Sequence, residues 1–131
     1  MHRNPLVREP IQKSLGQRDR VFLTEPLDYK QLVGAIARCY FLLTDSGGLQ
    51  EEAPSLGKPV LVLRDNTERP EAVNAGTAKL IGTNPEHIFA NAKKLLEDDQ
   101  AYNQMANAIN PFGDGLASKR IVKIIQQYFK C

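Results

Sequence analysis

The sequence has no long apolar run, few cysteines and no excess of charge of either sign. None of its apolar stretches approaches the ~20 residues that a transmembrane helix needs, and its beginning is too polar for a secretory signal. Its 17 basic and 15 acidic residues give a net charge of +2, which provides no electrostatic basis for binding nucleic acid or a membrane surface. The two cysteines, Cys39 and Cys131, make no disulfide framework. We therefore expect a cytoplasmic protein without nucleic-acid or membrane partners.

Several common site signatures are also missing. No G-x-G-x-x-G and no Walker A sequence occurs, so nothing supports a dinucleotide site of the usual kind. No cluster of His, Cys, Asp and Glu has the spacing of metal ligands. We expect neither a metal nor another cofactor. Of the two histidines, His87 lies early in an expected helix and is assigned to the surface, whereas His2 stands at the very start of the chain.

Short apolar runs alternate with helical patterns along the 131 residues, a length that fits one domain with a real core. Strands are expected at 21–23, 40–44, 60–63 and 78–81. Helices are expected at 9–15, 28–38, 48–56, 70–75, from 85 onward and at 116–129. This alternation predicts the α/β class, with a parallel sheet covered by helices on both faces.

The most informative stretch is Leu42–Glu71, in which a strand, a glycine turn, a helix and a second strand follow one another. Such a unit commonly holds a phosphorylated ligand at the N-terminus of the helix. The turn contains Ser46, Gly47 and Gly48, where glycine would let phosphate oxygens approach the backbone N–H groups and serine would add a hydroxyl donor. An ordinary capped turn is the alternative interpretation.

Charged side chains follow this turn. Glu51 and Glu52 are adjacent on the expected helix, so they point in different directions and at most one of them faces a ligand. For Glu52, the two hypotheses are an acceptor for ribose hydroxyls and an acid that stabilises the helix N-terminus. Arg69 follows the next strand and would reach the same edge of the sheet, where its guanidinium can bind phosphate in a bidentate manner. The alternative for Arg69 is a surface salt bridge with Glu68 or Glu71.

The chain closely resembles the bacterial non-hydrolysing UDP-N-acetylglucosamine 2-epimerases in the run TDSGGLQEEAPSLGKPVLVLRDNTERPEAVNAGTAKLIG. The segments 2–5, 25–29 and 110–115 resemble the family's His-x-Asn-Pro segment, its nucleotide-side loop and its late loop. The resemblance implies a Rossmann-like three-layer domain, the C-terminal half of a GT-B-type enzyme with two domains. Residues 1–131 would form this single UDP-binding domain, and the N-terminal domain would be absent.

The resemblance also implies roles for the residues of the central stretch. Ser46, Gly47 and Gly48 would hold the diphosphate of UDP. Glu52 would accept hydrogen bonds from the ribose hydroxyls, and Arg69 would contact the charged part of the nucleotide.

Three residues outside this stretch take roles from the same resemblance. Leu27 would lie beside uracil, and Leu32 stands where the family usually has a phenylalanine against the base. His2 resembles the histidine that helps to bind a second, regulatory UDP-GlcNAc molecule in bacterial members.

The family reaction interconverts UDP-GlcNAc and UDP-ManNAc in polysaccharide biosynthesis. UDP is eliminated to leave a 2-acetamidoglucal and is then added back with C2 inverted, without a metal or a nicotinamide. The family's proposed proton-transfer residues lie upstream, so the resemblance implies no catalytic residue here and an inactive isolated chain. It implies UDP-GlcNAc or UDP, the absent N-terminal domain and a second copy of the full-length protein as partners. A stand-alone UDP-sugar-binding regulatory module and the donor domain of a GT-B glycosyltransferase are the alternative hypotheses.

Overall fold

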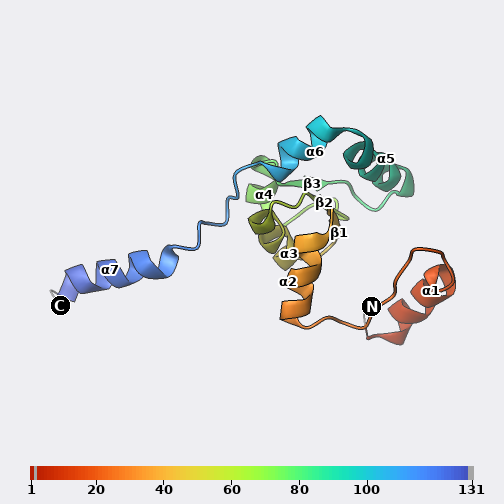
Figure 1. The fold of residues 1–131 in the computed structure, drawn as a ribbon, viewed down its shortest axis with the longest axis horizontal. Coiled ribbons are helices and arrows are strands. Elements are labelled where there is room, and N and C mark those ends of the chain that lie inside the picture. The colour runs from red at the N-terminus through yellow and green to blue at the C-terminus, as the bar shows by residue number, and fades with distance from the viewer. Residues whose placement is uncertain (2, 130–131) are drawn as a thin grey trace. The chain divides into compact units, whose positions relative to one another are not determined.

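The computed structural model describes residue 1 and residues 3–129, which fall into two units, Met1–Ala35 and Ile36–Cys131. The first unit contains helix α1 (Pro5–Leu15), drawn in red in Figure 1. Asn4 begins this helix, because its side chain accepts a hydrogen bond from the N–H of Leu6 at 3.0 Å and Pro5 fills the first helical position. The helix is longer than the predicted 9–15, since the start signal lies at this Asn-Pro pair.

The strand predicted at 21–23 is wrong. This segment has no regular structure, and Val21 and Phe22 are 40% and 87% exposed. A strand needs a neighbour to satisfy its backbone, and no described strand lies in the first unit.

Helix α2 (Tyr29–Arg38) begins after Asp28, as the sequence predicts. The Asp28 carboxylate accepts a hydrogen bond from the N–H of Gln31 at 2.8 Å. The Gln31 side chain accepts one from the N–H of Asp28 at 3.1 Å, which completes a reciprocal capping box.

The second unit is built around a parallel sheet of three short strands, which confirms the predicted α/β class. The strands are β1 (Leu42–Thr44), β2 (Val60–Val62) and β3 (Ala78–Leu80), in the order β1-β2-β3 (Figure 1). In the register, Leu43 pairs with Leu61 and Leu61 pairs with Lys79. All three strands therefore end at the same edge of the sheet.

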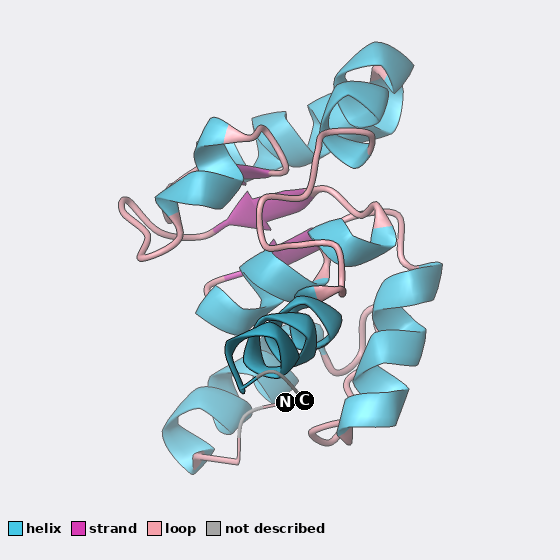
Figure 2. Cartoon of the chain, turned by 90° about the vertical axis from the view of Figure 1, so that its left-hand side faces the viewer, coloured by secondary structure: helices cyan, strands magenta, loops and turns pink. Residues whose placement is uncertain are grey.

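Helices lie on both sides of these strands (Figure 2), so the three-layer arrangement is confirmed. Side chains alternate between the two faces of a strand, and all of β2 is buried. Leu61 belongs to a core cluster with Ile81 and with Leu95 from α5 (Pro85–Glu97), and its strand neighbours Val60 and Val62 are 0% exposed. The central strand thus buries both of its faces, as a parallel sheet requires.

Two of the remaining helices differ from the prediction, and one agrees with it. The helix predicted at 48–56 is divided into α3 (Gly47–Glu52) and a 3₁₀ turn (Pro54–Leu56), because proline has no N–H to continue the helix. Helix α4 (Pro70–Asn74) is the predicted short helix. Helix α6 (Asp99–Ala106) was not predicted: Asp98 ends α5 and also caps α6, accepting a hydrogen bond from the N–H of Ala101 at 2.9 Å.

Helix α7 (Ala117–Phe129) is close to the predicted 116–129, but it buries none of its residues. Its apolar side chains, including Ile124, are exposed. No helix in the described part of the chain is both long and apolar enough to cross a membrane.

Candidate functional site

The turn after β1 opens α3 without a side-chain cap. Ser46 occupies the N-cap position in an extended conformation, but its side chain makes no capping hydrogen bond. Its backbone N–H donates to the Thr44 hydroxyl at 3.0 Å. By contrast, Asn84 caps α5 by accepting from two backbone N–H groups. The Ser46 hydroxyl is therefore not committed to the helix, and the structure does not have the side-chain-capped turn of the alternative interpretation.

The two glycines of this turn differ in their surroundings. A Cβ on Gly47 would meet only the end of the flexible Glu68 side chain, which is half exposed and can move aside. A Cβ on Gly48 would find only the Ser46 hydroxyl, 4.0 Å away, and the φ angle of Gly48 is not positive. Within the described chain, neither packing nor backbone conformation requires glycine at position 48.

Arg69 lies beside α3, as its position after β2 predicts. Its Nε donates to the Glu51 carboxylate, and its Nη1 donates to the carbonyl oxygen of Glu68 at 3.1 Å. The hydrogen bond to Glu51 raises the pKa of Arg69, and the charge of Glu51 adds to the effect. The ion pair is thus formed with Glu51 rather than with Glu68 or Glu71, and it connects the loop after β2 to α3.

Glu52 has different surroundings from its neighbour Glu51, as expected for adjacent helical residues. Its Oε2 atom is buried, and no described residue offers it a hydrogen bond. Glu52 is the last residue of α3, where the helix dipole disfavours a carboxylate, so it cannot stabilise the N-terminus of this helix. A buried carboxylate oxygen without a donor is unfavourable, and a ligand hydroxyl would relieve this.

The Glu68 carboxylate lies next to Gly47 and is held by a residue of its own loop, the loop after β2. It forms an ion pair with Arg64 at 2.7 Å. The hydrogen bond from its own backbone N–H is the first cause that lowers the pKa of Glu68, and the charges of Arg64 and Arg69 lower it further. A negative charge therefore lies next to the uncapped turn in this structure.

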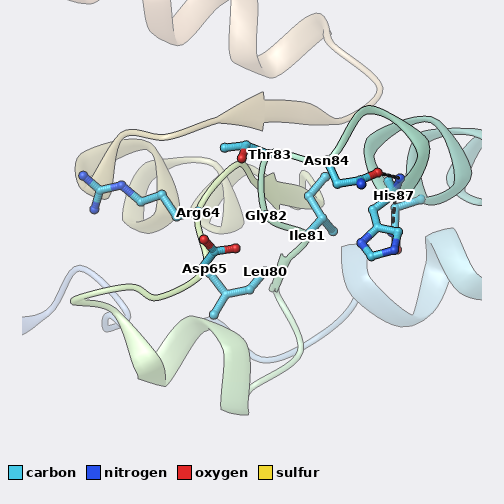
Figure 3. Close-up of a pocket in the computed structure, with 9 residues that line it drawn as sticks. Arg64, Asp65, Leu80, Ile81, Gly82, Thr83, Asn84 and His87 are labelled. Atoms are coloured by element: carbon cyan, nitrogen blue, oxygen red, sulfur yellow. Dashed lines mark hydrogen bonds between the residues drawn. The ribbon is translucent and has the colours of Figure 1, made fainter.

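A separate hollow lies at the carboxyl ends of β2 and β3 (Figure 3). It has a volume of about 490 Å³ and includes none of the predicted site residues among its lining. Arg64 and His87 line it but stand at opposite ends of the group in Figure 3, and Arg64 already pairs with Glu68. His87 is on the surface, as predicted. The two basic groups therefore do not converge on one point of this hollow.

The other predicted site residues lie outside the unit that carries this turn. Leu27 is 41% exposed and Leu32 is partly buried, and both belong to the first unit. Their place beside uracil stays a prediction. His2 lies outside the described residues. Across residues 1 and 3–129, no group of His, Cys, Asp and Glu is arranged to hold a metal ion.

Two polar residues near the turn were missed by the sequence reasoning. Gln50 is buried, and Thr67 donates a hydrogen bond to its side chain at 2.7 Å. A glutamine among the helical residues that follow a glycine turn gives no signal of burial. Only the packing of the loop after β2 against α3 reveals this contact.

The site has the composition of an α/β domain that binds a phosphorylated ligand at the carboxyl edge of a parallel sheet. The glycine turn opens α3, Arg69 pairs with Glu51 on this helix, and the helix ends at Glu52 with its unpartnered oxygen. The chain belongs to the UDP-N-acetylglucosamine 2-epimerase family, whose sequence model matches residues 1–126. The fold agrees with this assignment, because similar solved structures are UDP-N-acetylglucosamine 2-epimerases.

Individual relatives cover nearly all of this chain. The UDP-N-acetylglucosamine 2-epimerase of Bacillus subtilis is 58% identical over 123 residues, which are 94% of this chain and 32% of that protein. A Staphylococcus aureus MnaA structure with UDP has a TM-score of 0.91 and 56% identity, covering 99% of this chain and 36% of that one. The Neisseria meningitidis epimerase bound to UDP-GlcNAc has a TM-score of 0.90 and 51% identity, covering 97% and 35%. The chain thus spans about a third of the length of these relatives.

Proposed function

We propose that this chain is the UDP-binding part of a UDP-N-acetylglucosamine 2-epimerase, which interconverts UDP-GlcNAc and UDP-ManNAc. The proposal rests on the uncapped turn at Ser46 and on the Arg69 side chain, which is paired with Glu51 of the helix that this turn opens. The same helix ends at Glu52, whose buried oxygen has no partner. Solved relatives with UDP and with UDP-GlcNAc support the choice of nucleotide.

Each group at the turn has a role that its chemistry supports. The Ser46 hydroxyl and the N–H groups of Gly47 and Gly48 donate hydrogen bonds to the diphosphate. The Arg69 guanidinium, held in place by Glu51, adds positive charge to the same anion. The Glu52 carboxylate accepts hydrogen bonds from the ribose hydroxyls, which gives its buried oxygen a partner.

The remaining roles rest on the family resemblance. Residues 1–131 belong to one nucleotide-binding domain, in which Leu27 lies beside uracil and Leu32 provides an apolar wall for the base. His2 contributes to a second, regulatory site for UDP-GlcNAc. The full-length protein pairs with a second copy of itself, and its N-terminal domain closes the other side of the cleft.

In the proposed reaction, C2 loses a proton and UDP departs from C1 with the bonding electrons of the glycosidic bond. This leaves the 2-acetamidoglucal. UDP then adds back to C1, and C2 regains a proton on the opposite face. The residues of this chain stabilise the negative charge of the departing diphosphate. Proton transfer at C2 is assigned to residues outside this chain, so the chain alone is expected to be inactive.

We also place the protein in the cytoplasm. The Cys39 thiol is free, and this suits a reducing compartment. Nucleotide sugars would reach the site there without crossing a membrane.

Calorimetric titration of the purified chain with UDP tests the proposal. We expect saturable binding, weaker binding of ADP, and no epimerisation of UDP-GlcNAc by the chain alone. ADP retains the diphosphate and ribose, so the comparison isolates recognition of the base. Absence of saturable UDP binding by a folded chain would contradict the proposal, and equal affinity for ADP would contradict the roles of Leu27 and Leu32.

Replacing Gly48 by alanine provides a second test at the turn. Alanine is favoured over glycine in helices by up to about 1 kcal/mol, and open space surrounds this position, so stability should be unchanged or raised. UDP affinity should fall by about tenfold or more, because the new Cβ stands where the diphosphate approaches. Calorimetry and thermal unfolding on the same variant separate the two effects. Wild-type affinity in Gly48→Ala would remove Gly48 from the site.

A further inference from the structure

We propose that Gln50 and Thr67 are positioning residues that hold the two turns of the nucleotide site in register. The inference deepens the proposed function and rests on it. Neither side chain is assigned to touch the nucleotide. Together they connect the turn after β1, which carries Ser46, with the loop after β2, which carries Arg69.

Gln50 provides the first half of the connection. Its side chain is 0% exposed, although it is polar and lies in the short helix α3. Its Nε2 donates a hydrogen bond to the carbonyl oxygen of Ser46 at 3.2 Å. Its Oε1 accepts a hydrogen bond from the Thr67 hydroxyl at 2.7 Å. Both ends of the amide are therefore satisfied, one by each turn.

Thr67 provides the second half. Its hydroxyl donates to Gln50 and accepts a hydrogen bond from the backbone N–H of Arg69 at 3.0 Å. The hydroxyl thus fixes the backbone from which the Arg69 side chain reaches Glu51. On the other turn, the Thr44 hydroxyl accepts a hydrogen bond from the N–H of Ser46. The N–H and the carbonyl oxygen of Ser46 are therefore both hydrogen-bonded to side chains.

A continuous chain of hydrogen bonds results, from the Ser46 carbonyl through Gln50 and Thr67 to the Arg69 amide. Buried networks of this kind specify one arrangement when every member is satisfied. The diphosphate donors and the guanidinium come from segments about twenty residues apart in the sequence. One anion binds both segments more tightly when their relative position is already fixed, because ordering them on binding would reduce affinity.

Replacing Thr67 by valine tests this, with Thr67→Ser as the matched control. Valine keeps the shape but removes the hydroxyl, and serine keeps the hydroxyl. We expect Thr67→Val to weaken UDP binding by about tenfold and Thr67→Ser to stay within about twofold of the wild type. Gln50→Met, which removes both hydrogen bonds in a side chain of similar length, should resemble Thr67→Val.

Amide hydrogen exchange gives a measurement that needs no nucleotide. In Thr67→Val, exchange at Ser46, whose N–H is hydrogen-bonded to the Thr44 hydroxyl, should accelerate although this residue is distant in sequence, while exchange at Leu61 in the core stays slow. Thr67→Ser should leave exchange at both Ser46 and Leu61 unchanged. Faster exchange at Leu61 as well would show general destabilisation and would overturn the positioning role.

The two proposals fail in different ways. A wild-type chain that does not bind UDP contradicts the proposed function, while the exchange measurement still decides whether the turns are coupled. A Thr67→Val chain with wild-type UDP affinity, or with unchanged exchange at Ser46, overturns the inference and leaves the proposed function in place.

Discussion

Replacing Glu52 by alanine should weaken UDP binding by roughly 10–150-fold without destabilising the chain. Hydrogen bonds to a charged group contribute ~1.5–3 kcal/mol, and this free energy corresponds to that range of dissociation constants. The fold gains little from Glu52, because its Oε2 is buried without a partner and it stands at the C-terminal end of α3. UDP affinity should therefore fall while the free energy of unfolding is unchanged or rises, as expected for a residue that serves binding rather than stability.

Calorimetry with UDP and thermal unfolding should both be measured on this variant. Glu86→Ala is a suitable control, because Glu86 is an exposed acid in the first turn of α5. It should lose no UDP affinity and at most a few tenths of a kcal/mol of stability. An unchanged dissociation constant in Glu52→Ala would exclude the ribose role. Loss of folding in this variant would show instead that the carboxylate supports the fold.

Replacing Leu61 by alanine should lower the free energy of unfolding by about 2–5 kcal/mol. Leu61 lies in the central strand, is 1% exposed, and packs against Ile81 and Leu95. Leu61 is itself paired on both sides, with Leu43 and Lys79, so the structure has little freedom to close the cavity. A change of this size is a large part of the ~5–15 kcal/mol that stabilises a typical domain.

Chemical unfolding of Leu61→Ala alongside Ile124→Ala measures this effect. Ile124 has the same apolar character but is 63% exposed on α7, so its replacement should change stability by no more than about 0.5 kcal/mol. Similar losses in the two variants would contradict the assignment of the core to the faces of β2.

The sheet could be predicted because its signals are local. Short apolar runs at 42–44, 60–62 and 78–80 alternate with helices, and a parallel sheet is the usual arrangement for that order. Capping chemistry was equally informative at Asp28 and Asn84. The segment 21–23 was misread because apolar character does not reveal whether a strand has a neighbour. The start of α6 was hidden because Asp98 serves two helices at once.

The candidate site was predictable in part. The glycine turn and Arg69 could be placed together, since parallel strands end at the same edge of a sheet. The choice of Glu51 as the partner of Arg69, and the burial of Gln50, depend on how the loop after β2 packs against α3. No local pattern specifies that packing. The unpartnered oxygen of Glu52 is likewise visible only in three dimensions.

Amide NMR of the chain during titration with UDP tests the central claim most directly, because it locates the bound nucleotide. The account predicts saturable shifts at Ser46, Gly47, Gly48 and Arg69, with little change at Gly82 in the hollow of Figure 3. Shifts confined to Gly82 and its neighbours, or no shifts in a well-dispersed spectrum, would contradict it.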